Sequence, residues 1–322
     1  MQYRRLGQSG LEVSSLCLGT MAFGRWIDEA ASAEIIDAAI DQGINFIDTA
    51  DLYGKGQDEA FKYGTGDSES IIGRALKGKR DRIVLATKVG GAMGHGRTDS
   101  GYSRIHLMRE IEQQLTRLQT DHIDYYQVHS FKPETPLEET LRALDDLVRQ
   151  GKIRYIGCSN YAAWQIAKCH AISDRMNLEK FIAVQSEYNL LRRDIENEII
   201  PFCKSENVGL MVYSPLARGV LAGRYRTMDD VPEDSRAAHG EEKIKGYFTE
   251  DNFSLVAQYS SLAEKYGISL AQLSLAWVLQ KPEVTTAIVG ASKVHHVTDA
   301  LKTAQWQIPE DLMQEIEKIG KP

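Results

Sequence analysis

The sequence is poor in cysteine, and its cysteines form no recognisable pair. The four that occur, Cys17, Cys158, Cys169 and Cys203, are scattered without a C-x-x-C spacing. In a chain long enough to bury a sizeable core, such cysteines are typical of thiols kept in a reducing compartment. We therefore expect buried, free thiols.

Long apolar runs are missing as well. No stretch approaches the roughly 18 apolar residues that a membrane-spanning helix needs. Two arginines stand near the start, at positions 4 and 5, but no continuous apolar stretch follows them. The N-terminus therefore lacks the pattern of a signal peptide, and these absences together predict a cytoplasmic protein.

The chain has no basic tract, and its net charge is −7. Nothing in this distribution favours a nucleic-acid partner or an anionic membrane surface. With 43% hydrophobic and 26% charged residues over 322 positions, the composition fits a globular protein with a large core. The length suits a β/α barrel with insertions, and no linker interrupts it, so we expect one domain over residues 1–322.

Short apolar runs alternate with amphipathic helical patterns from end to end. Eight runs rich in β-branched or aromatic residues are strand candidates, at 15–19, 45–50, 83–88, 124–130, 154–159, 183–188, 209–214 and 285–290. The clearest helical patterns between them cover 29–42, 68–77, 104–118 and 135–150. This alternation predicts parallel strands joined by crossover helices.

The helix predicted over 135–150 has the most readable ends. Thr135 and Glu138 have the spacing of a capping box, and Pro136 between them suits the first helical position. Gly151 would end the helix in a left-handed conformation, as Gly43 and Gly78 would end earlier helices.

The first strand candidate is not followed by G-x-G-x-x-G, so the usual phosphate fingerprint of an open doubly wound sheet is absent. Eight units without a break in composition favour a closed (β/α)8 TIM barrel instead. Residues 1–14 predict a small β-hairpin beneath that barrel. Residues 54–67 and 224–248 do not fit the repeat and are expected to form extended loops.

Ionisable side chains stand where three consecutive strand candidates end: Asp48, Lys88 and His129, with Tyr53 following Asp48 in its loop. Active sites of β/α barrels lie at the C-terminal ends of the strands. A lysine beside a tyrosine favours the phenolate, so we expect the pKa of Tyr53 to fall below its reference value of about 10. The set suits delivery of a proton to an oxygen that is becoming an alkoxide, and it offers neither a nucleophile nor metal ligands.

The three segments that contain these four residues resemble the tetrad motifs of the aldo-keto reductases. They are IDTADLY at 47–53, LATK at 85–88 and YYQVH at 125–129. The resemblance covers nearly the whole chain and is closest to bacterial members and the branch of potassium-channel β subunits. It implies reduction of aldehyde or ketone carbonyls, with sugar-derived carbonyls among the candidates, using NADPH. By this resemblance Tyr53 is the general acid, Lys88 and Asp48 tune it, and His129 orients the carbonyl.

Each of these residues also has a simpler interpretation: Asp48 as a helix cap, Lys88 as a solvated loop end and His129 as a core histidine. Their joint placement at matching strand ends favours the functional interpretation. The stretch YGTGDSE at 63–69 nearly duplicates YGKGQDE at 53–59, so Tyr63 competes with Tyr53. The intact D-T-A-x-x-Y spacing favours Tyr53, and Tyr63 would then belong to a lid.

The resemblance further implies an NADPH or NADP+ site formed by the loops after the barrel strands. The expected contacts are Thr20, Met21, Asp48, Ser159, Asn160, Gln185, Tyr213, Ser214, Leu216, Arg218, Arg224, Arg236, Gly290, Ser292, Lys293, His296 and Asp299. Tyr213 would stack on the nicotinamide ring, and the stretch SPLARG at 214–219 would hold the pyrophosphate. Ser292 and Lys293 offer a hydroxyl and a cation to a 2′-phosphate, which favours NADP(H) over NAD(H).

Apolar residues near the strand ends are candidates for the substrate wall or for ordinary core: Met21, Phe23, Trp26, Phe131 and Tyr161. Such walls suit a small carbonyl substrate. Two other functions stay open at this point. One is a nucleotide-binding assembly module resembling the potassium-channel β subunits, with weak turnover. The other is a lyase that uses Lys88 as a Schiff-base nucleophile. The chain could be a monomer or a homo-oligomer.

Overall fold

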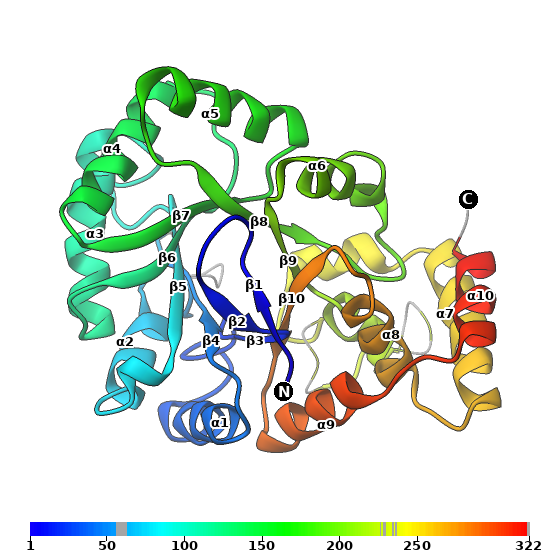
Figure 1. The fold of residues 1–322 in the computed structure, drawn as a ribbon. Helices are drawn as coiled ribbons and strands as arrows, with labels where there is room; N and C mark the ends of the chain where they lie inside the picture. Colours follow the sequence, from blue (N-terminus) through cyan, green and yellow to red (C-terminus); the bar gives the residue numbers. More distant parts are fainter. Residues whose placement is uncertain (56–62, 226, 228–229, 234, 236, 321–322) are drawn as a thin grey trace.

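A closed barrel of parallel strands forms the centre of the molecule (Figure 1). The computed structural model describes residues 1–322 except 56–62, 226, 228–229, 234, 236 and 321–322. The barrel strands are β3 (Leu16–Gly19), β4 (Phe46–Asp48), β5 (Val84–Val89), β6 (Ile123–Val128), β7 (Ile153–Ser159), β8 (Phe181–Glu187), β9 (Gly209–Tyr213) and β10 (Val284–Gly290). They pair in chain order, and β10 closes on β3. The predicted (β/α)8 fold is confirmed.

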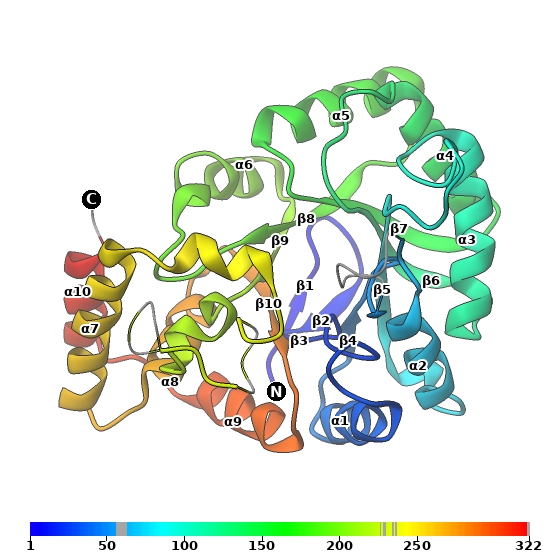
Figure 2. The ribbon, with the colours of Figure 1, turned by 180° about the vertical axis from the view of Figure 1, so that it is seen from behind.

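Helices cover the outside of the barrel in both views (Figures 1 and 2). They are α1 (Glu29–Asp41), α2 (Asp67–Ala75), α3 (Arg104–Leu118), α4 (Leu137–Arg149), α5 (Ala163–Met176), α6 (Ile199–Glu206), α7 (Glu250–Lys265), α8 (Leu270–Leu279), α9 (Val294–Gln305) and α10 (Glu310–Ile319). Helices α7 and α10 pack on each other at one edge of the molecule. The predicted stops at Gly43, Gly78 and Gly151 all have positive φ, as expected.

Helix α4 begins later than predicted. Pro136 has φ −56° and ψ 129°, which is an extended conformation, so it is the last residue before the helix. Thr135 therefore lies outside the capping position, and no side chain caps the helix. The predicted capping box with Glu138 is wrong. The leucines on one face of the helix, Leu141, Leu144 and Leu147, are buried.

The N-terminal hairpin closes one end of the barrel. It consists of β1 (Tyr3–Arg5) and β2 (Glu12–Ser14), which lie across the barrel end in Figure 1. Leu6 and Val13 are fully buried against side chains from the barrel interior. Gly7 has φ 58°, and a Cβ there would lie 2.0 Å from the carbonyl oxygen of Ile182, so only glycine fits. The hairpin covers the N-terminal ends of the strands, and the site must open at the opposite end.

The four cysteines are buried and free, as predicted. Burial raises the pKa of the Cys17 and Cys158 thiols well above the ordinary value. Their thiolate forms are therefore scarce, and both thiols are expected to be unreactive. Among the described residues, no helix combines the length and apolar character needed to cross a membrane.

Candidate active site

The strand ends bring the four predicted residues together at the open end of the barrel. Asp48 is the last residue of β4, Lys88 the next-to-last of β5, and His129 the first residue after β6. Because these neighbouring strands are parallel, their C-terminal ends meet at one rim. Tyr53 reaches the same place from the loop after β4, where its hydroxyl lies 3.4 Å from Lys88 Nζ.

Lys88 is the centre of this group and is completely buried. Its ammonium donates to Asp48 Oδ2 and, at 2.9 Å, to the carbonyl oxygen of Thr49, besides facing the Tyr53 hydroxyl. Burial alone would lower the pKa of Lys88, but Asp48 and Tyr53 outweigh it, and the pKa is raised. Lys88 is therefore a buried cation at neutral pH, paired with a buried carboxylate.

The second oxygen of Asp48 is held by two glutamines. Asp48 Oδ1 accepts hydrogen bonds of 2.9 Å from Gln127 Nε2 and from Gln185 Nε2. Gln127 is absent from the predicted site. A signal for it exists, because alternation along a strand places Gln127 on the same face as Tyr125 and His129. A polar residue at an inward position of an apolar strand needs a partner, and here the partner is Asp48.

The phenol of Tyr53 does not have the predicted lowered pKa. Burial raises the pKa above its usual value, and the opposing effect of Lys88 does not compensate. The cation favours the phenolate, but the loss of solvent around the phenolate disfavours the charged form more strongly. Tyr53 is therefore a neutral phenol at pH 7, hydrogen-bonded to a cation, which is the state that donates a proton.

His129 lies edge-on to Tyr53, with ring centroids 5.9 Å apart. Burial, and then the charge of Lys88, keeps the pKa of His129 well below its usual value, so the imidazole is neutral. Its Nδ1 is buried and, among the described residues, has no hydrogen-bond partner. A buried polar atom of this kind beside a cavity is typical of a position that a ligand satisfies.

A long cavity of about 1420 Å³ starts at these residues and extends to the beginning of α9. The residues predicted to contact a cofactor line it: Thr20, Met21, Asp48, Ser159, Asn160, Gln185, Tyr213, Ser214, Leu216, Arg218, Arg224, Gly290, Ser292, Lys293, His296 and Asp299. The remaining prediction, Arg236, lies outside the described residues. Tyr53 is among the described residues that line the cavity and Tyr63 is not; the Tyr63 ring contacts His95 instead, at 4.2 Å between centroids.

Near the four predicted residues, Asn160 links the side chain of Tyr213 to the backbone of His129. Its Oδ1 accepts a 2.8 Å hydrogen bond from the Tyr213 hydroxyl, and its Nδ2 donates to the carbonyl oxygen of His129 at 3.0 Å. Asn160 has φ 58°, a left-handed conformation that asparagine tolerates better than most residues. Asn160, Gln185 and Tyr213 all line the cavity.

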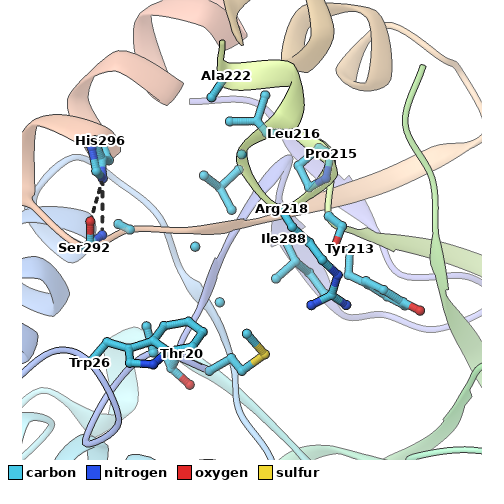
Figure 3. Close-up of a pocket in the computed structure, with 18 of the residues that line it drawn as sticks. Thr20, Trp26, Tyr213, Pro215, Leu216, Arg218, Ala222, Ile288, Ser292 and His296 are labelled. Carbon is cyan, nitrogen blue, oxygen red and sulfur yellow. Dashed lines mark hydrogen bonds between the residues drawn. The ribbon is translucent and has the colours of Figure 1, made fainter. Parts of the chain in front are cut away.

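The SPLARG stretch after β9 has an unusual backbone. Ser214, Ala217 and Arg218 all have positive φ, which is uncommon for residues other than glycine. Figure 3 shows Arg218 beside Tyr213 in the cavity, across from Thr20 and Trp26. The Arg218 guanidinium forms a nearly buried ion pair with Glu241. No sequence pattern predicts this partner, because Glu241 stands in an irregular loop further along the chain.

The far end of the cavity is polar and cationic. His296 Nδ1 accepts a 3.2 Å hydrogen bond from the backbone N–H of Ser292 (Figure 3). Burial, followed by the charges of His295 and Lys293, lowers the pKa of His296. Cationic side chains from two segments line this end: Arg224 from the loop after the SPLARG stretch, and Lys293 and Lys302 from the start and the body of α9. The surroundings of Ser292 therefore suit an anionic group.

The structure separates the candidates for the apolar wall from those for the core. Met21 and Trp26 line the cavity. Phe23 is completely buried in the core, the second of the two alternatives given for it. Phe131 and Tyr161 pack on each other with centroids 5.3 Å apart and are not among the described residues lining the cavity. The Trp26 ring stacks instead on an unpredicted residue, His239, at 5.8 Å.

The residues that line the cavity suit an organic cofactor. In the described part of the chain, no group of three or more histidine, cysteine, aspartate or glutamate side chains is arranged to hold a metal ion. The carboxamides of Asn160 and Gln185, the ring of Tyr213 and several cationic side chains line this cavity. These residues and the size of the cavity fit a nicotinamide dinucleotide.

Comparisons with known proteins agree with a barrel oxidoreductase. The family model of the aldo/keto reductase family matches residues 15–321. The chain belongs to the aldo/keto reductase family, whose members generally reduce carbonyls with a nicotinamide cofactor.

Its relatives have diverse names. An uncharacterized oxidoreductase, YrpG, of Bacillus subtilis is 36% identical, over 99% of this chain and 96% of the relative. Versiconal hemiacetal acetate reductase of Aspergillus parasiticus is 34% identical, over 100% of this chain and 98% of its own length. A probable voltage-gated potassium channel subunit beta of Oryza sativa subsp. japonica is 34% identical, over 94% of this chain and 90% of the relative.

Proposed function

We propose that the protein is an NADPH-dependent reductase of aldehyde and ketone carbonyls. The observation that carries this proposal is the buried ammonium of Lys88, held between Asp48 and Tyr53 at the end of the long cavity. A buried charge is costly, and structures retain it where its field is needed. Here its field acts on a phenol that faces the cavity.

Each of the four residues has a role in the proton transfer. Tyr53 donates its hydroxyl proton to the carbonyl oxygen of the substrate, and the O–H bond of the alcohol forms as the phenolic O–H bond breaks. Lys88 stabilises the phenolate left behind, and Asp48 holds Lys88 charged and in place. The neutral His129 donates a hydrogen bond to the same carbonyl oxygen. Bound NADPH supplies the hydride that the carbonyl carbon accepts.

Two alternatives have less support. As a Schiff-base nucleophile, Lys88 would have to be a free amine, yet Asp48 and Tyr53 raise its pKa and it donates to three oxygens. A pure binding or assembly module would have no need for a buried ion pair aimed at a phenol. The assembly function remains an alternative because the rice relative is named as a potassium channel subunit. The complete set of four residues favours turnover.

The direct test follows NADPH absorbance with a broad panel of carbonyl compounds, beginning with a reactive aldehyde such as 4-nitrobenzaldehyde. We expect steady oxidation that depends on both the aldehyde and the protein. No turnover with any aldehyde or ketone, using either reduced nicotinamide, would contradict the proposal. Tight binding of NADPH without turnover would favour the assembly module.

The choice of NADPH over NADH has its own prediction. Replacing Lys293 with alanine removes a cation from the end of the cavity that suits the 2′-phosphate. A charge-assisted hydrogen bond contributes about 1.5–3 kcal/mol, so the dissociation constant for NADPH should rise about tenfold or more. That for NADH should not change. Fluorescence titration measures both, with the exposed Lys168→Ala as the control; equal wild-type affinity for the two cofactors would contradict NADPH preference.

A further inference from the structure

Asp51 is a buried carboxylate that the proposed chemistry does not use. It lies three residues after Asp48 and two before Tyr53, and its side chain is completely inaccessible to solvent. One of its oxygens, Oδ2, accepts hydrogen bonds from two backbone N–H groups, of Gly90 at 2.8 Å and of Gly91 at 2.9 Å. Both glycines follow β5, the strand that carries Lys88.

Two more hydrogen bonds hold Asp51 in this position. The backbone N–H of Asp51 donates to the carbonyl oxygen of Lys88 at 3.0 Å. The second carboxylate oxygen, Oδ1, accepts from the N–H of Leu52 at 2.7 Å, which fixes the rotamer of the side chain. The carboxylate thus joins the segment that ends in Tyr53 to the turn directly after Lys88.

The turn is shaped to approach this carboxylate. Gly90 has φ 117°, and a Cβ there would lie 2.3 Å from the ring of Tyr102. A Cβ on Gly91 would lie 2.9 Å from Asp51 Oδ1. A side chain at Gly91 would push the turn and the carboxylate apart, and one at Gly90 would collide with Tyr102. The close approach is therefore a specific feature of this loop pair.

Holding a carboxylate here is costly. Glu69 and Glu110 lie near it, and Arg117, which is bonded to both glutamates, is the cation of this group. Burial, and then the charges of Glu69 and Glu110, raises the pKa of Asp51 to about 7. A neutral side chain at this position would avoid that cost, so packing alone does not account for an aspartate.

We propose that Asp51 is a positioning residue for the proton transfer: its carboxylate holds the Tyr53 segment against the end of β5 and so sets the contact between the Tyr53 hydroxyl and Lys88. The inference rests on the proposed function. The 3.4 Å separation of that hydroxyl from Lys88 Nζ is at the outer limit of a hydrogen bond, so a small displacement of the loop would break it.

The test uses Asp51→Asn, which keeps the size of the side chain. An amide presents one oxygen, so its NH2 group must face a backbone N–H and at least one of the bonds is lost. Displacements of about 1 Å can cost on the order of 100-fold in rate, so we expect kcat to fall by about 10- to 100-fold. The KM for the aldehyde and the dissociation constant for NADPH should stay the same. Hydrogen exchange should accelerate in the cofactor-free protein at the backbone amide that then faces the NH2 group, which is that of Leu52 or those of Gly90 and Gly91.

Asp145→Asn is the matched control. Asp145 on α4 is also a buried carboxylate that accepts a backbone N–H from another segment, that of Glu179, and it is not among the described residues lining the cavity. This variant should lose thermal stability and keep kcat. An Asp51→Asn variant with wild-type kcat would overturn the proposal whichever of the three amides exchanges faster, as would equal loss of kcat in both variants. If the wild-type protein reduces no carbonyl, the proposed function fails, and the positioning role fails with it.

Discussion

Replacing Tyr53 with phenylalanine should lower kcat for carbonyl reduction by about 10²- to 10⁴-fold, the usual contribution of a positioned general acid. The substitution removes the hydroxyl that faces Lys88 and leaves the ring that contacts His129. Binding of NADPH should persist, because the amide and cationic ends of the cavity are untouched. Stopped-flow absorbance for the single turnover and fluorescence titration for NADPH separate the two effects.

Tyr63→Phe is the natural control for this experiment. Its ring contacts His95, and its hydroxyl has no place in the proton transfer proposed for the cavity. Wild-type kcat in Tyr63→Phe together with a large loss in Tyr53→Phe would assign the general acid. The reverse result would move that role to the second of the two duplicated motifs.

Replacing Lys88 with methionine should slow turnover strongly and also destabilise the fold. Methionine fills a similar volume but leaves Asp48 as a buried carboxylate whose remaining partners are Gln127 and Gln185. Breaking a buried ion pair in this way typically costs about 3–5 kcal/mol. Urea denaturation should report a loss of that size, and NADPH oxidation should fall by about as much as in the Tyr53 variant, on the order of 10²- to 10⁴-fold.

The double variant Lys88→Met with Asp48→Asn separates stability from chemistry. Neutralising Asp48 removes the unpaired charge, so most of the lost free energy of unfolding should return. Catalysis should not return, because no ammonium faces Tyr53. A double variant that regained turnover would show that the buried charge serves the fold alone.

Much of the fold followed from local patterns in the sequence. Eight short apolar runs recur with helical segments between them, and each run became a barrel strand because parallel strands buried on both faces need continuous apolar stretches. The start of α4 did not follow, because a proline can be either the first helical residue or the extended residue before it. Its backbone angles decide between the two, and the sequence of Thr135 to Glu138 is compatible with both.

The site was predictable where residues stand at strand ends and unpredictable where it depends on burial or on distant loops. The spacing from Asp48 to Tyr53 placed the phenol correctly. The direction of the shift in the Tyr53 pKa depends on how far burial outweighs the charge of Lys88, which only the three-dimensional structure shows. The pairing of Arg218 with Glu241 joins two irregular segments, for which no periodic pattern exists.

The position of Gln185 affects how the cofactor preference and the proton transfer of this protein could evolve. Strands β4 to β6 and their loops carry the residues proposed for proton transfer, and β7 to β10 with their loops carry most of those proposed for the dinucleotide. Gln185 bonds across the barrel axis to Asp48 and Gln127, so it couples the two arcs at a shared point. Selection could therefore retune cofactor preference at Lys293 without altering the acid, whereas a change at Gln185 would disturb both properties at once.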